Sequence, residues 1–399
     1  MSQDIRDFAT SPCELLALGE PVHPTQEPAF GDVRNDVFAS LAELGYRSIA
    51  LETDRVAALA VDDFVRHGRG TLDTAMDEGF SHGFGDLEAN RRLVSWMRGY
   101  NESRPAEERL AFHGFDIPAE NTSAPSPRRH LEHACAYLGA APDLAGLLGD
   151  DERWSRQEAI LDPAASVGAG PGAERLRVIA DDMLTSLHAR APELVAATSR
   201  ADWFRARTHL TAGLGLLRYH AQAARRVEES ARISGLLATR DALMAQNLLE
   251  IRGIEAERGP TLAFAHNSHL QRNPSSMSMA GMDLGWHSAG SVVGALLGRR
   301  YTVVIGSLGR SAALGLAEPE PDTYEGLLQS RATPWGLATA AAVASGSRRT
   351  DARPERGYFP LDRALVEAAD AILHVDADRA RAAAHAPDGP GRAEGEARA

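Results

Sequence analysis

Short apolar runs of strand length recur along this chain and alternate with segments of helical periodicity. The runs lie at residues 15–19, 48–51, 110–116, 261–265, 301–306 and 371–375. A helical pattern at 30–44 lies between the first and second runs, and helical patterns at 54–67 and 86–100 lie between the second and third runs. Strands joined by helix-length segments form parallel neighbours, because a crossover helix can connect them. We therefore expect an α/β fold with a mainly parallel central sheet flanked by helices.

The pattern becomes purely helical in the middle of the chain, which predicts a helical insertion or cap lobe between two parts of the sheet. The end of the chain is rich in Ala, Gly, Pro, Arg and Glu and has few core-forming residues, which is typical of disorder. The expected segments are a disordered lead-in (1–13), a first part of the α/β core (14–124), the helical lobe (125–258), a second part of the core (259–378) and a disordered tail (379–399).

Composition excludes several classes of function. The net charge of −13 disfavours nucleic acid and anionic membrane surfaces as partners. The chain contains no lysine, so Schiff-base chemistry, pyridoxal phosphate anchoring and a phosphate-loop lysine are impossible. Two cysteines, Cys13 and Cys135, form neither a disulfide framework nor a Cys-based zinc site. No targeting or membrane-spanning segment is evident, so the cytoplasm is the expected location.

Titratable residues follow three of the apolar runs directly. Glu20 and His23 follow the first run, Glu52 follows the second, and His266 and His269 follow the run at 261–265. Open α/β sheets carry their chemistry at the carboxyl ends of strands. If the three strands are neighbours, these five side chains converge on one cleft.

The candidate cleft residues admit several roles. His23 is a candidate general base, with Glu20 or Glu52 supporting it. His266 and His269 can be read as a second acid/base pair, as zinc ligands or as loop residues. Their spacing lacks a recognised third metal ligand, so we expect no metal and no cofactor.

The sequence around Ser288 does not favour a serine nucleophile. The sequence around Ser288 resembles a nucleophile elbow, but Trp286 stands where that motif needs glycine. The preceding residues 277–282 make a poor strand pattern, and the following residues suit a helix. We therefore expect Ser288 near a helix start.

Three further polar residues lie on predicted helices. Arg34 lies on the first helix, where a solvated face is the simplest interpretation. Arg240, Met244 and Asn247 share one face of a later helix. That face is either a polar patch that reaches the cleft or a helix–helix contact.

The chain resembles the erythromycin esterase family, which also includes proteins of succinoglycan biosynthesis, over about residues 12 to 310. The resemblance rests on five motifs in the family's order: Gly19-Glu20-Pro21-Val22-His23, Ala50-Leu51-Glu52, Phe112-His113-Gly114-Phe115-Asp116, Arg240-Asp241-x-x-Met244-Ala245-x-Asn247 and Ala265-His266-Asn267-Ser268-His269. Pro24 departs from the pattern, because glycine usually follows the first-motif histidine.

The resemblance implies metal-independent hydrolysis of a macrolide lactone. It makes His23 the base that activates water, with Glu20 and Glu52 as its carboxylate supports and with His266 and His269 in the same cleft. It also makes four residues candidates for binding substrate: Arg34, Asp116, Arg240 and Asn247.

Three functions remain open at this point. The first is an esterase-like hydrolase of a small natural product. The second is a biosynthetic enzyme that uses the same base for elimination or ring closure. The third is a non-catalytic small-molecule binding protein. The sequence does not give the oligomeric state.

Overall fold

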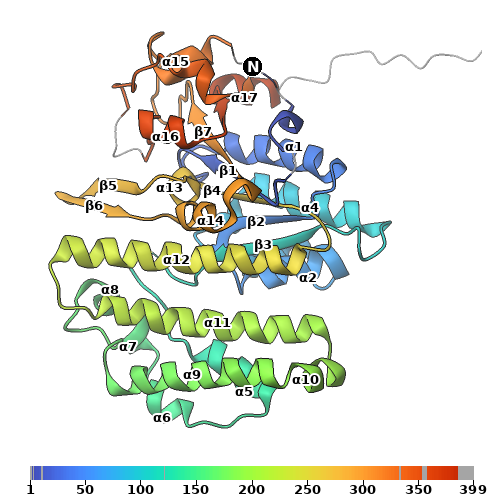
Figure 1. Cartoon of the computed structure of the whole chain (residues 1–399), viewed down its shortest axis with the longest axis vertical. Helices are drawn as coiled ribbons and strands as arrows, with labels where there is room; N and C mark the ends of the chain where they lie inside the picture. The colour runs from blue at the N-terminus through green and yellow to red at the C-terminus, as the bar shows by residue number, and fades with distance from the viewer. Residues whose placement is uncertain are drawn as a thin grey trace, which may run out of the picture.

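A seven-stranded sheet forms the centre of the computed structural model, which describes residues 2, 4–9, 12–120, 122–331, 334–352 and 357–384. Its strands are β1 (Leu15–Glu20), β2 (Ser48–Asp54), β3 (Ala111–Asp116), β4 (Thr261–His266), β7 (Tyr301–Leu308), β8 (Trp335–Ala338) and β9 (Ala371–Val375). They lie in the order β3-β2-β4-β1-β7-β9-β8 (Figure 1). All neighbours are parallel except β8 and β9. The mainly parallel α/β sheet is thereby confirmed, and the edge strand β8 is an unpredicted addition.

One face of the sheet is covered by helices from the first part of the chain. These are α1 (Ala29–Glu43), α2 (Ala58–His67) and α4 (Glu88–Glu102), with α3 (Leu72–Gly79) and η2 (Phe84–Asp86) between the last two. Successive strand residues point to opposite faces. Accordingly, Leu16 and Leu18 of β1 share a core with Phe30 and Phe38 of α1.

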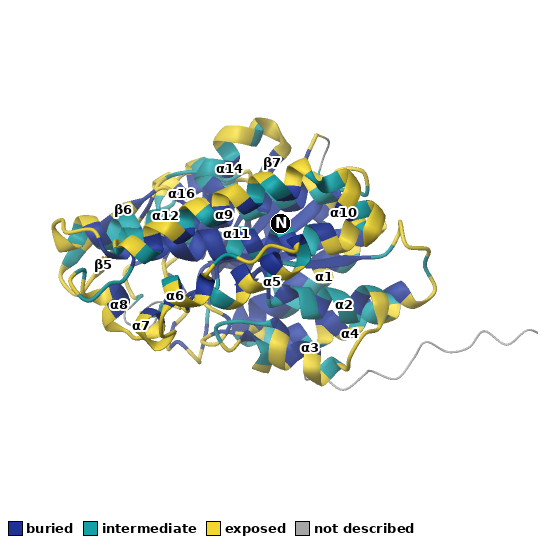
Figure 2. Cartoon of the chain, turned by 90° about the horizontal axis from the view of Figure 1, so that it is seen from below, coloured by how far each residue is buried: buried dark blue, intermediate teal, exposed yellow. Residues whose placement is uncertain are grey.

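The other face is covered by α12 (Glu229–Glu255) and by shorter helices. The shorter elements are α13 (Asn267–Leu270), α14 (Ala289–Leu297), η3 (Gly298–Arg300), α15 (Tyr324–Gln329), η4 (Ala340–Val343) and α16 (Arg363–Ala368). Leu248 of α12 shares a core with Ala17, Ala50 and Ala263 of three adjacent strands. Because both faces of the sheet are covered, every residue of β1, β2 and β4 is buried. Figure 2 shows exposed residues on the outer helices.

A helical lobe stacks on the outer side of α12 (Figure 1). It consists of α5 (Arg128–Leu138), α6 (Leu144–Leu148), α7 (Glu152–Ser155), α8 (Glu158–Leu161), α9 (Pro171–Ala189), α10 (Ala191–Ala197) and α11 (Arg200–Ala223). Trp154, Leu176 and Trp203 belong to a separate core within it. The lobe is helical as expected, while α12 belongs to both layers, because it packs on the sheet and on α11. The domain boundaries stay a prediction.

The expected disorder at the two ends is wrong for the residues that the structure describes there. Residues 5–7 form η1 (Ile5–Asp7), and Ile5 is buried in the core beside α1. Residues 377–384 form α17 (Ala377–Ala384), whose Arg381 pairs with buried Glu27 at 2.7 Å. These segments gain order from contacts with distant parts of the chain, which local composition does not reveal. Residues 385–399 lie outside the described residues.

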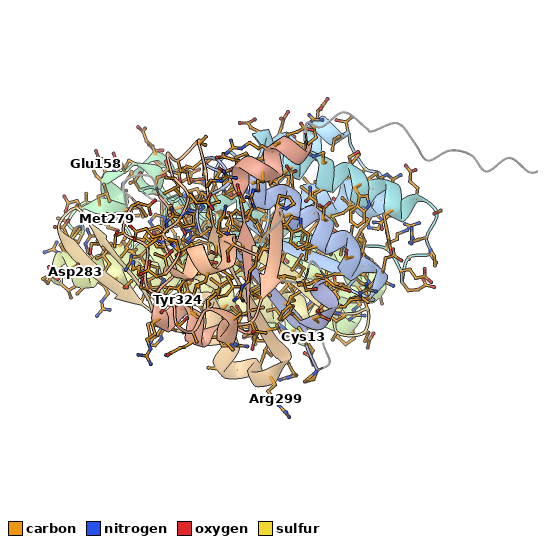
Figure 3. All side chains as sticks on the ribbon, turned by 90° about the horizontal axis from the view of Figure 1, so that it is seen from above. Cys13, Glu158, Met279, Asp283, Arg299 and Tyr324 are labelled. Carbon is orange, nitrogen blue, oxygen red and sulfur yellow. The ribbon has the colours of Figure 1, made fainter. Side chains whose placement is uncertain are left out.

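Residues 275–286 form a β-hairpin, although the sequence around residue 280 shows a poor strand pattern. Strands β5 (Ser275–Met279) and β6 (Met282–Trp286) pair antiparallel. Ala280 and Gly281 between them both have positive φ, as tight hairpin turns require. Met279 and Asp283 lie at its outer end (Figure 3). Because much of the hairpin is exposed, it lacks the apolar run that predicted the other strands.

No helix among the described residues is both long and apolar enough to cross a bilayer.

The core between α12 and the sheet makes a stability prediction. Leu248 is fully buried there. We expect Leu248→Ala to lower the free energy of unfolding by roughly 2–5 kcal/mol, because the vacated volume cannot be refilled completely. Leu296→Ala is the matched control, because Leu296 is 62% exposed and should change stability by no more than about 0.5 kcal/mol. Urea unfolding followed by circular dichroism measures both. A loss of unfolding free energy in Leu248→Ala as small as that in Leu296→Ala would show that α12 does not depend on this contact.

Candidate active site

The carboxyl ends of four adjacent strands bring the predicted acidic and histidine residues together. Glu20 ends β1 and His266 ends β4, and the two are register partners. Glu52 lies near the end of β2, and Asp116 ends β3. Because β3, β2, β4 and β1 are neighbours in that order, segments far apart in the sequence supply one site.

A cleft of about 490 Å³ opens at these strand ends. It is lined by His23, Thr25, Gln26, Glu52, His82, Gly83, Phe84, Glu120 and Arg240. Three of the sequence-predicted site residues therefore line it directly: His23, Glu52 and Arg240. Of the helical region 125–258, Arg240 of α12 alone is among the lining residues. The lobe, which stacks on the outer side of α12, therefore supplies none of this lining.

Glu52 lies at the centre of the site. Its carboxylate accepts the backbone N–H of His266 at 2.9 Å. His269 Nε2 and Arg240 Nη2 each lie 3.5 Å from its Oε1. Burial by itself raises the pKa of Glu52, but electrostatic interactions with His269, His23 and Arg240 outweigh burial and lower the pKa to about 2. Glu52 is therefore ionised at neutral pH.

His269 is held as a cation between two carboxylates. Its Nδ1 lies 2.9 Å from Asp241 Oδ1, opposite the Nε2 that faces Glu52. Burial lowers its pKa, but Asp241 and Glu52 raise it to about 9. Asp241 also accepts bonds from the Trp286 indole N–H at 2.9 Å and the Ala289 N–H at 2.7 Å.

Asp241 is part of one of the five family motifs, but it was not among the residues predicted for the active site. One signal was available. Asp241 stands three, four and seven positions before Met244, Ala245 and Leu248, which are apolar. A charged residue on the apolar face of a helix is buried and needs a partner.

His23 and His266 face each other as neutral imidazoles. Their ring centroids are 5.1 Å apart, and His266 Nδ1 lies 2.7 Å from Ser268 Oγ. Burial and the nearby His23 lower the pKa of His266 to about 3. Desolvation also lowers the pKa of His23, although Glu52 opposes the shift. His23 is itself exposed to the cleft.

Arg240 connects Glu52 to a second acidic residue. Its Nε donates to Asp116 Oδ1 at 3.0 Å and its Nη2 to Asp116 Oδ2. His82 Nε2 lies 3.0 Å from the same carboxylate, and His82 Nδ1 lies 2.8 Å from Glu120. Asp241, His269, Glu52, Arg240, Asp116, His82 and Glu120 thus form a chain of alternating charge, which we call the charge network. His82 and Glu120 were missed, because the loops that carry them have no local pattern.

Glu20 and Arg34 lie behind the cleft rather than in its lining. Glu20 is 2% exposed, and its Oε2 has no hydrogen-bond partner among the described residues. Burial and the charge of Glu52 raise the pKa of Glu20 well above its usual value. Arg34 donates to Asn90 at 2.9 Å and lines a different cavity beside Trp335. The sequence pattern could not show that Glu20 and Arg34 lie behind the cleft, because their burial depends on how β1 and α1 pack in the folded protein.

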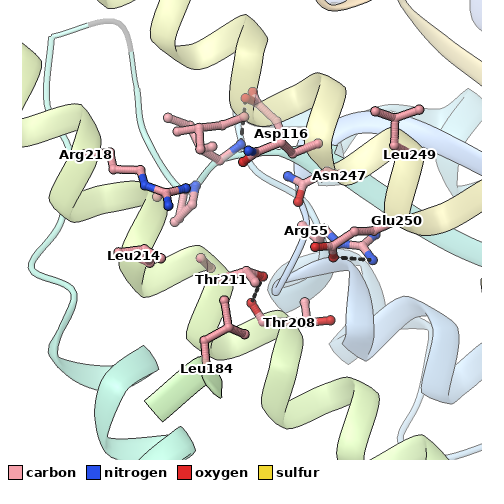
Figure 4. A pocket seen from close by; sticks show the side chains of 16 residues that line it. Arg55, Asp116, Leu184, Thr208, Thr211, Leu214, Arg218, Asn247, Leu249 and Glu250 are labelled. Atoms are coloured by element: carbon pink, nitrogen blue, oxygen red, sulfur yellow. Dashed lines mark hydrogen bonds and ion pairs between the residues drawn. The ribbon is translucent and has the colours of Figure 1, made fainter. Parts of the chain in front are cut away.

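Asn247 also lies outside the cleft. Its amide donates to the Phe115 carbonyl at 3.0 Å. It lines a cavity of about 300 Å³ between α11 and α12, together with Asp116 and Arg55 (Figure 4). Asn247 therefore fixes α12 to the end of β3, while Asp116 contacts the cleft residues Arg240 and His82.

The geometry bears on two other chemistries, a serine nucleophile at Ser288 and a metal site. Ser288 caps the N-terminus of α14, accepting from the Ser291 N–H, and its Oγ donates to the Gln271 carbonyl at 2.7 Å. The expected position near a helix start is confirmed. Within the described part of the chain, no group of three or more His, Cys, Asp or Glu side chains is arranged to hold a metal ion.

Comparisons with known proteins agree with this architecture. The family model described as erythromycin esterase matches residues 41–385. This confirms the resemblance, but the matched segment begins after His23 and extends beyond residue 310. No curated protein matches the sequence.

Solved structures share the fold at low sequence identity. A Bacillus cereus protein has a TM-score of 0.66 at 14% identity, covering 93% of this chain and 90% of its own. A histidine-to-asparagine mutant of erythromycin esterase EreC, in its open conformation, has a TM-score of 0.61 at 17% identity, with coverages of 93% and 94%. A succinoglycan biosynthesis protein has a TM-score of 0.61 at 13% identity, with coverages of 92% and 88%.

The lowered pKa of His266 predicts a pH dependence of stability. Below pH 6.5 the unfolded chain protonates this histidine, whereas the folded chain does so only near its pKa of about 3. Stability is therefore lost as the pH falls through this interval. In His266→Gln, we expect the slope of unfolding free energy against pH, between pH 4.5 and 6.5, to decrease by about 1.4 kcal/mol per pH unit.

Urea titrations at several pH values measure this slope. His287→Gln is the control, because His287 is exposed and lies outside the site. An unchanged slope in His266→Gln would mean that His266 is already protonated in the folded protein.

Proposed function

We propose that this chain, which belongs to the erythromycin esterase family, hydrolyses an ester or lactone of a small natural product with His23 as the general base. Membership of the family supports an esterase-like hydrolase in general. The observation that carries the finer proposal is the exposure of His23 to a cleft whose floor holds the ionised Glu52.

His23 has the properties that a base needs at neutral pH. Its lowered pKa leaves the imidazole unprotonated and able to accept a proton from water. As His23 becomes cationic, the nearby carboxylate of Glu52 stabilises the new charge. Glu52 cannot take this proton easily, because its own pKa is about 2.

Arg240 is the best-placed group for the substrate carbonyl. Asp116 occupies its Nε and Nη2, whereas Nη1 has no hydrogen-bond partner among the described residues. A preorganised donor of this kind stabilises the oxyanion that forms when water attacks. Three other basic residues of the site are less suitable: His266 is neutral, both ring nitrogens of His269 face carboxylates, and Arg34 does not line the cleft.

The cleft supports a small-molecule substrate. A volume of about 490 Å³ lies within the usual range for such sites. Phe84 supplies apolar surface in the lining, and Phe359 packs on His266 with ring centroids 5.4 Å apart. One of the structural relatives is an erythromycin esterase, so erythromycin is the first macrolide to test.

Replacing the base tests the proposal directly. We expect His23→Asn to lower kcat for p-nitrophenyl acetate and for any hydrolysed macrolide by about 10²–10⁴-fold, because general base catalysis contributes that much. KM should change little, because the asparagine fills similar space. Thr25→Ala, which removes a hydroxyl group from the lining of the same cleft, is the matched control and should retain most activity.

The outcome also distinguishes the alternatives. Mass spectrometry in ¹⁸O-labelled water should find one labelled oxygen in the acid product. Loss of activity in His23→Asn without incorporation of water would favour elimination or ring closure by the same base. Unchanged turnover in His23→Asn would contradict the assignment of the base.

We further propose that hydrolysis requires no metal. Within the described residues the site has charge-paired carboxylates and histidines rather than a set of free ligands. Dialysis against a chelator should leave kcat unchanged for a substrate that His23→Asn fails to hydrolyse. Loss of activity that added zinc restores would contradict this prediction.

A further inference from the structure

His82 is a histidine of the cleft to which the proposed mechanism gives no role. It lies on the loop after α3, and its backbone has a positive φ of 60°. Ser81, the preceding residue, is fixed to the end of β2 because its N–H donates to Thr53 Oγ1 at 2.7 Å and its Oγ accepts the Asp54 N–H at 2.9 Å. A positive φ is uncommon for residues other than glycine. The two bonds of Ser81 hold the backbone of His82 in this conformation.

The surroundings of His82 keep it protonated. Asp116 from β3 and Glu120 from the following loop bind its two ring nitrogens, and Arg240 from α12 is the cation that opposes them. Burial lowers the pKa of His82, but the two carboxylates raise it to about 9. His82 thus carries a proton at the pH at which His23 lacks one.

The two histidines lie in the same cleft. Both line it, and both pack against the Phe84 ring, with centroid distances of 6.4 Å for His23 and 5.6 Å for His82. A cleft with one unprotonated and one protonated imidazole has the two groups that acid–base hydrolysis requires.

We propose that His82 is a second catalytic residue, the general acid that gives its proton to the oxygen of the leaving alcohol. This inference rests on the proposed function of the same cleft. His23 takes a proton from water, and the resulting hydroxide forms a bond to the carbonyl carbon. The bond from that carbon to the leaving oxygen then breaks, and the proton of His82 neutralises the departing alkoxide. Proton exchange with solvent restores both histidines, so one water is consumed.

Nδ1 is the nitrogen that delivers the proton. Asp116, on the Nε2 side, is fully buried and bound to Arg240. Glu120, on the Nδ1 side, has a side chain that is 56% exposed. A leaving oxygen can therefore replace Glu120 at Nδ1, while Asp116 continues to hold the ring.

Leaving-group dependence tests the inference. An alkoxide needs a proton to depart, whereas p-nitrophenolate does not. We expect His82→Asn to lower kcat/KM for ethyl butyrate by at least about tenfold and for p-nitrophenyl butyrate by less than about threefold. His287→Asn, at an exposed histidine outside the cleft, should change neither value. An equal loss on both esters, or no loss on either, would overturn the inference.

The pH profile gives a second readout. The alkaline decline of kcat/KM for ethyl butyrate, expected near pH 9, should disappear in His82→Asn. Should that variant not fold, Glu120→Gln keeps the inference testable. Because Glu120 raises the pKa of His82, its loss should move the alkaline decline to lower pH. An unmoved decline would overturn the inference, whereas full activity of His23→Asn would contradict the proposed function instead.

Discussion

The bond between the Glu52 carboxylate and the backbone N–H of His266 is the interaction on which the site depends. It joins residues 214 positions apart, and it forms only because β2 and β4 are parallel neighbours. A buried carboxylate is costly unless it is paired and hydrogen-bonded. His269 and Arg240 supply the compensating charge, so the position of Glu52 fixes where two cations must lie.

The charge network also determines how α12 sits on the sheet. Arg240 and Asp241 are consecutive residues of opposite charge. Arg240 pairs with Asp116 at the end of β3, and Asp241 pairs with His269 after β4. Sliding or rotating α12 by one residue would break both pairs and leave buried charges without partners. Apolar contacts such as that of Leu248 with the strand alanines stabilise the layer, and the two pairs select its register.

Three histidines of the site show how one residue type takes different roles. His269 lies between two carboxylates and has a pKa near 9. His266 is fully desolvated beside His23, which outweighs the opposing effect of Glu52, and has a pKa near 3. His23, exposed to the cleft, is neutral at physiological pH. Their protonation states are properties of the surroundings, so the H-x-x-H spacing alone does not assign them.

The sequence by itself determined the segments of β1, β2, β3, β4, β7 and β9, the mainly parallel sheet and the excluded lysine chemistry, because periodicity and composition are local properties. It also marked Glu52, His23 and His266 through their positions after apolar runs. Only the tertiary structure decided that Arg34 and Asn247 lie outside the cleft and that His82 and Asp241 join the charge network. These outcomes depend on which strands are neighbours and how deep each side chain lies, and contacts between distant segments set both.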